Sequence, residues 1–105
     1  MNSSAAIQES VYKWALEQNF TAPYGVLTGE HQSKKGRKYK SVTFGYSRTL
    51  DATVEVFNRN FIVYKSSLGE NHLFKSYEEM MKFLMERFNT VDTEPFYEDV
   101  FPEGN

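Results

Sequence analysis

The stretch from Val42 to Tyr64 constrains the fold most, because apolar residues alternate there with small or polar ones in three short runs. A period of two is typical of a strand with one buried face. The runs cover residues 42–46, 52–56 and 61–64. The connections between them are short, which favours pairing of neighbours in sequence order. The sequence therefore predicts a three-stranded antiparallel meander.

Helical patterns flank these runs. Apolar residues recur every three or four positions over 5–18, namely Ile7, Val11, Trp14 and Ala15, with Leu16 beside them. Ser76 and Glu79 form a capping box, and an apolar face follows up to Asn89. We expect an α+β fold of order α-β-β-β-α, with the meander packed against two helices. The side chains expected to cover the sheet are Trp14, Leu16, Leu84 and Phe88.

The pattern divides the chain into one α+β domain, residues 1–89, and an acidic-aromatic C-terminal tail, residues 90–105. The glycines and proline of residues 20–38 indicate a long, partly irregular basic loop. Val26 and Leu27 allow a short edge strand within it. Phe57, Phe61 and Val63 are expected on the outer face of the sheet. They form an exposed apolar patch there unless the tail covers them.

The absence of cysteine excludes a disulfide framework, a zinc ribbon, an iron–sulfur site and a thiol nucleophile. No apolar run approaches the ~20 residues of a transmembrane helix, and the first residues lack the pattern of a signal peptide. We therefore expect a soluble protein of the reducing cytoplasm that does not bind membranes.

No catalytic motif is present: the chain has no G-x-S-x-G, no phosphate-binding glycine loop and no H-E-x-x-H. His31 and His72 each follow a glycine and a glutamate in segments predicted as loops, which would suit a divalent metal only if the two loops met. Nothing in the spacing requires that. The expectation is a non-enzymatic protein without cofactor or metal.

The net charge of −2 conceals two opposite poles. Residues 31–65 carry a net charge of +6, and residues 66–105 carry −6. The positive pole is densest in one run, which consists of Lys34, Lys35, Arg37, Lys38, Tyr39 and Lys40. Cations on a flexible loop suit phosphate contacts, and Tyr39 adds a ring for base stacking. One hypothesis is therefore a nucleic-acid-binding module, and the alternative is a solvated loop that discourages edge pairing of the sheet.

The order α-β-β-β-α is similar to that of double-stranded-RNA-binding domains. In that family the second helix opens with a lysine- and alanine-rich segment that contacts phosphates. Here the corresponding segment, residues 74–79, contains Glu78 and Glu79, whose charge would repel a duplex. The similarity is confined to the element order.

The tail mixes acids with aromatic residues, an arrangement that suits docking into a partner's groove. The residues expected to contact a protein partner are Glu94, Phe96, Tyr97, Glu98, Asp99 and Phe101. We expect a small binding protein that acts as an inhibitor, adaptor or regulator by occupying a surface of a macromolecule. In type the chain resembles accessory proteins of phages, including inhibitors of host nucleases or defence systems. That resemblance implies action in the host cytoplasm. The alternatives are the nucleic-acid-binding role and a tail that folds back onto the domain.

Overall fold

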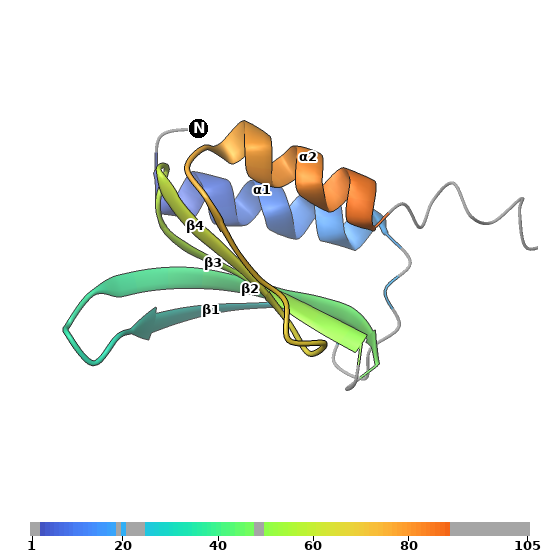
Figure 1. The fold of residues 1–105 in the computed structure, drawn as a ribbon, viewed down its shortest axis with the longest axis horizontal. Coiled ribbons are helices and arrows are strands. Elements are labelled where there is room, and N and C mark those ends of the chain that lie inside the picture. Colours follow the sequence, from blue (N-terminus) through green and yellow to red (C-terminus); the bar gives the residue numbers. More distant parts are fainter. Residues whose placement is uncertain (1–2, 19, 21–24, 48–49, 89–105) are drawn as a thin grey trace, which may run out of the picture.

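A computed structural model describes residues 3–18, 20, 25–47 and 50–88, and it confirms the α+β class. Its elements, in chain order, are α1 (Ser4–Glu17), β1 (Leu27–Gln32), β2 (Lys38–Ser47), β3 (Leu50–Asn58), β4 (Phe61–Ser66), β5 (Asn71–Phe74) and α2 (Tyr77–Arg87). The strands form one sheet, and both helices lie on the same face of it (Figure 1). The opposite face has no described helix over it, and we call it the open face.

Both helices begin at the serine caps that satisfy their first amides. The Ser3 Oγ accepts a hydrogen bond from the amide of Ala6 at 3.1 Å, and the Ser76 Oγ accepts one from the amide of Glu79 at 3.1 Å. The predicted cap at Ser76 is confirmed in its bond to the amide of Glu79. The two helices also contact each other, through a hydrogen bond between the hydroxyls of Ser10 and Tyr77.

The prediction of three strands was wrong, because the sheet has a further strand at each edge. The strand order is β1-β2-β3-β4-β5, with every neighbour antiparallel. The meander itself is confirmed. The additional strands also remove the similarity in element order to double-stranded-RNA-binding domains.

Both edge strands lie in segments that the sequence predicts mainly as loops, with a short edge strand allowed at Val26 and Leu27. β1 lies within 20–38 and pairs with β2 from Leu27↔Thr43 to Gln32↔Lys38. β5 pairs with β4 from Ile62↔Phe74 to Lys65↔Asn71. Most residues of both strands are exposed, so neither strand shows the apolar alternation of a half-buried strand.

The core lies between the helices and the sheet. Alternate residues of the three central strands are buried there: Val42, Phe44, Ala52, Val54, Val56, Ile62 and Tyr64. The helices contribute Ile7, Val11, Trp14, Ala15, Met80, Met81 and Leu84. The prediction that Leu16 covers the sheet was wrong, since its side chain is 55% exposed. Leu16 follows Ala15 by one residue and so points about 100° away from the buried stripe.

An aromatic cluster closes one end of the core. Trp14, Phe20, Phe44 and Phe88 contact one another with ring centroids 5.0–6.1 Å apart. Phe20, which follows α1, is partly buried and packs against this core. Within the described residues, no helix is long and apolar enough to cross a membrane.

Candidate functional site

The basic run lies at the tip of the β1–β2 hairpin rather than in an irregular loop. Three hydrogen bonds donated by backbone amides close the turn. The amide of Ser33 donates to the carbonyl of Arg37 at 2.7 Å, and the amide of Gly36 donates to the carbonyl of Ser33 at 2.9 Å. The amide of Arg37 donates to the Ser33 Oγ at 3.1 Å. Gly36 has a φ of +84°, a conformation that glycine adopts without steric cost. The cations are therefore displayed on an ordered turn.

Most of these cations pair with no carboxylate among the residues that the structure describes. Lys40 pairs with Glu30 across the hairpin, with Nζ and Oε2 3.1 Å apart, and its side chain is only 25% exposed. Lys34, Lys35, Arg37 and Lys38 are exposed, and no ion pair joins them to any carboxylate in the described part of the chain. These four residues, which we call the cationic tip, are the unneutralised part of the predicted basic site.

Four rings cross the open face beside the cationic tip. His31 of β1 stacks on Tyr39 of β2 with centroids 5.0 Å apart and planes inclined by 27°. Tyr39 stacks in turn on Phe57 of β3 at 4.6 Å and 29°, and Phe57 contacts Phe61 of β4 at 4.9 Å and 48°. We call these four residues the aromatic row. The predicted location of Phe57 and Phe61 on the outer face agrees with the register, since each is adjacent in sequence to a buried residue of the core face.

Arg37 connects the cationic tip to the aromatic row. Its guanidinium carbon lies 4.7 Å from the ring centroid of Phe61 and 5.3 Å from that of Phe57. A guanidinium over two ring faces is held by cation–π attraction, which keeps its charge on the open face. The basic run and the outer-face aromatics, which the sequence suggested separately, therefore form one continuous surface.

His31 is the member of this surface that sequence reasoning did not connect with it. Its Nε2 lies 2.9 Å from the Ser41 Oγ, and its ring lies close over Gly29. A Cβ at Gly29 would come within 2.8 Å of that nitrogen, so only glycine leaves room for this ring position. The other histidine, His72, lies on the opposite edge strand and contacts Phe83 of α2. The two histidines do not meet.

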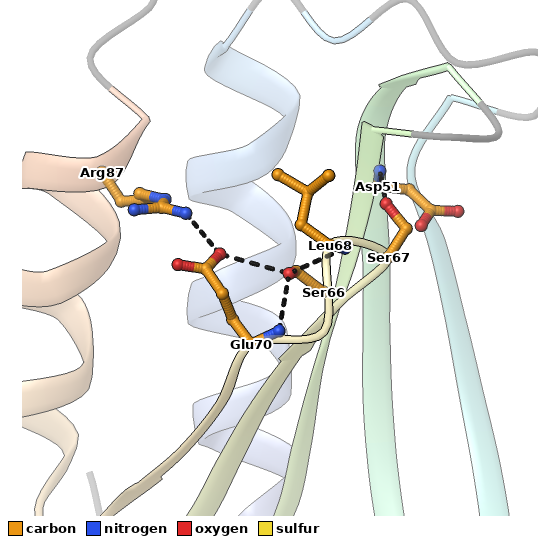
Figure 2. Close-up of polar contacts among 6 residues, drawn as sticks. All are labelled: Asp51, Ser66, Ser67, Leu68, Glu70 and Arg87. Atoms are coloured by element: carbon orange, nitrogen blue, oxygen red, sulfur yellow. Dashed lines mark hydrogen bonds and ion pairs between the residues drawn. The ribbon is translucent and has the colours of Figure 1, made fainter.

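A second polar cluster lies at the other end of the sheet, where the β4–β5 turn meets the end of α2 (Figure 2). The Ser66 Oγ accepts hydrogen bonds from the amides of Leu68 at 3.2 Å and Glu70 at 3.3 Å, and it donates to the Glu70 carboxylate at 3.1 Å. Arg87 forms an ion pair with the same carboxylate. These groups satisfy one another's hydrogen-bonding capacity, and the ion pair of Glu70 with Arg87 links the β4–β5 turn to the end of α2.

This cluster borders a pocket of about 230 Å³. Its lining residues are Asp51, Tyr64, Ser66, Ser67, Leu68, Glu70, Arg87 and Phe88. Burial of Tyr64, and secondarily the negative charge of Glu70, raise the pKa of the Tyr64 hydroxyl above its ordinary value of 10.0. The Arg87 guanidinium opposes that shift. The neutral hydroxyl is thus the form that the folded protein favours.

The residues expected to dock a protein partner lie outside the described residues. These are Glu94, Phe96, Tyr97, Glu98, Asp99 and Phe101. Partner docking by the tail therefore stays a prediction.

Three kinds of comparison with known proteins give no match. No known protein family, no curated protein and no solved structure matches this chain. Function must therefore be inferred from the geometry of the molecule.

Proposed function

We propose that this protein binds nucleic acid, and that the cationic tip of the β1–β2 hairpin makes the phosphate contacts. The observation that carries this proposal is the set of four exposed cations, Lys34, Lys35, Arg37 and Lys38, on one ordered turn without a neutralising carboxylate among the described residues. Such a turn concentrates positive potential at a projecting point of a chain whose net charge is −2.

Phosphate binding is favoured by cations that are already separated from acidic partners. A lysine that must first leave a carboxylate loses part of the gain from contacting a phosphate, whereas Lys34, Lys35 and Lys38 make no such contact with any described residue. Each phosphate neutralised also releases condensed counterions, and that release drives association at low salt.

The order of the turn adds to this advantage. The hydrogen bonds of Ser33, Gly36 and Arg37 fix the backbone that carries the cations, so less conformational entropy is lost on binding than with a disordered loop. Arg37 is fixed further by its two ring contacts. The site is thus largely preformed in the free protein.

The test compares two variants that lose the same charge. The first is Lys34→Gln with Lys35→Gln and Lys38→Gln, and the matched control is Lys13→Gln with Lys75→Gln and Lys82→Gln, three exposed lysines elsewhere on the molecule. Fluorescence anisotropy with labelled DNA and RNA oligonucleotides is recorded from about 50 to 300 mM salt.

For duplex DNA, we expect the hairpin variant to lower the slope of log affinity against log salt by nearly 3, at about 0.9 for each lost phosphate contact. The control variant should keep the slope of the unmodified protein. The proposal fails if no oligonucleotide binds at low salt, or if the hairpin and control variants lose equal affinity. The second of these results would show that only net charge matters.

A further inference from the structure

The two inner rings of the aromatic row, Tyr39 and Phe57, have neighbours on both sides. Tyr39 has His31 stacked on one side, from β1, and Phe57 on the other, from β3. Phe57 has Tyr39 on one side, and Phe61 and the Arg37 guanidinium also contact it. Single-strand binding without sequence preference depends on aromatic faces that are free to stack on successive bases. Base stacking on Tyr39, which the sequence suggested, would require His31 or Phe57 to move away.

The aromatic row instead braces the hairpin. It joins four strands by side-chain contacts, and the Ser41 hydroxyl and the bare backbone of Gly29 hold the His31 ring at its outer end. Cross-strand aromatic pairs stabilise antiparallel sheets. A hairpin stiffened in this way keeps its shape where it extends past the rest of the sheet.

The hairpin projects beyond the helical layer (Figure 1). The start of α1, at Ser4, borders a hollow that Glu30, His31, Lys38, Tyr39 and Lys40 also line, so the part of the hairpin farthest from the helices is its turn. Beyond the Glu30↔Lys40 pair, two further residue pairs and the turn continue the ribbon. At ~3.3 Å per residue, this extension is about 10 Å long. The major groove of B-form DNA is ~12 Å wide and admits a two-stranded ribbon of this kind, and phosphates line both of its edges.

We propose that the β1–β2 hairpin enters the major groove of duplex DNA as a two-stranded ribbon, with the cationic tip contacting phosphates and the aromatic row holding the ribbon rigid. This inference rests on the proposed function and names the nucleic acid that the site takes. Duplex RNA fits less well, because the major groove of an A-form helix is deep and too narrow for side chains to read.

The test measures the affinity of the unmodified full-length protein for four probes of one sequence and ~20 nucleotides: duplex DNA, each of its single strands, and the matching duplex RNA. We expect duplex DNA to bind at least tenfold more tightly than any other probe. Methyl green, which occupies the major groove, should displace the protein, and distamycin, which occupies the minor groove, should not.

Substitutions at Tyr39 test whether the aromatic row stiffens the hairpin or stacks on bases. Tyr39→Phe keeps the ring between His31 and Phe57, so it should bind duplex DNA like the unmodified protein. Tyr39→Leu removes the ring, so it should weaken duplex binding and speed amide exchange in β1 and the turn. If it folds poorly, Gly29→Ala loosens the outer end of the row at His31 and should weaken duplex binding to a smaller extent.

The outcomes separate the two proposals. Equal or tighter binding of a single strand or of duplex RNA, or displacement by distamycin, overturns the groove assignment and leaves nucleic-acid binding intact. A Tyr39→Leu variant that loses only single-strand binding also overturns it, because that result identifies a stacking platform. Absence of binding to all four probes overturns both proposals.

Discussion

Ser66 offers a precise test of how the β4–β5 turn is held. Its hydroxyl makes three hydrogen bonds, two accepted from the amides of Leu68 and Glu70 and one donated to the Glu70 carboxylate. A neutral hydrogen bond contributes about 1 kcal/mol net, and one to a charged group about 1.5–3 kcal/mol. The amide of Leu68 is exposed and regains water when the hydroxyl is lost, so its share is small. We expect Ser66→Ala to lower the free energy of unfolding by about 2 kcal/mol.

Urea denaturation measures this loss, with the fluorescence of Trp14 as the signal. Trp14 is the single tryptophan and is 8% exposed within the aromatic cluster, so its emission reports on the core. With a typical urea dependence of 1–3 kcal/mol per molar, the midpoint should fall by on the order of 1 M at an unchanged slope.

Ser33→Ala is the matched control for this experiment. The Ser33 hydroxyl accepts one hydrogen bond, from the amide of Arg37, in an exposed turn. Its loss should lower the free energy of unfolding by about 0.5 kcal/mol. A Ser66→Ala midpoint equal to that of Ser33→Ala would refute the reasoning, because it would show that the contacts of Ser66 with Glu70 contribute nothing.

Two further predictions concern pH and the tail. The pKa of Tyr64 is raised in the folded state, so the stability that its neutral hydroxyl contributes is present below pH 10 and is lost as pH rises through the folded pKa. In urea titrations, Tyr64→Phe should therefore lose less stability than the unmodified protein between about pH 9 and 11, and parallel losses would contradict this. Deleting residues 90–105 removes five carboxylates and no cation, so affinity for duplex DNA should rise several-fold at about 50 mM salt and the gain should fade near 300 mM. If the tail docks a protein partner, the same deletion should abolish capture of that partner without lowering the melting temperature, and unchanged capture would exclude the tail as the docking motif.

The central strands and both helices could be predicted because each has one buried face. In β3, for example, Ala52, Val54 and Val56 are buried while Thr53 and Glu55 are partly exposed, so the sequence alternates visibly. β1 has no buried residue, and it is joined to β2 by backbone hydrogen bonds, by the turn at Gly36 and by surface contacts such as the Lys40–Glu30 ion pair. Such contacts leave no apolar period in the sequence, and for that reason the sequence predicts a loop over 20–38 with only a short edge strand at Val26 and Leu27.

The residues of the candidate site could be predicted from the sequence, but their arrangement on one surface could not. The cations at 34–40 stand together in the sequence, and Phe57 and Phe61 follow from alternation. The cations and the aromatic rings form one surface because of the strand register, which places Tyr39 between His31 and Phe57. Register across β1 depends on the turn length, and the turn was not recognised because β1 itself was not.

The uninterrupted strand order bears on how quickly the chain reaches its native state. Each strand pairs with the one before it, so the sheet can grow by successive hairpins that close short loops. The long-distance contacts are those of the two helices: the Gln8 amide of α1 donates to the carbonyls of Gly29 and Ser41, both at 3.1 Å, and Phe88 at the end of α2 contacts Phe44. Sheets are usually the slow part of folding because they join distant segments, whereas here every strand pairing is between sequence neighbours and the distant contacts are those of the helices with the sheet and with each other.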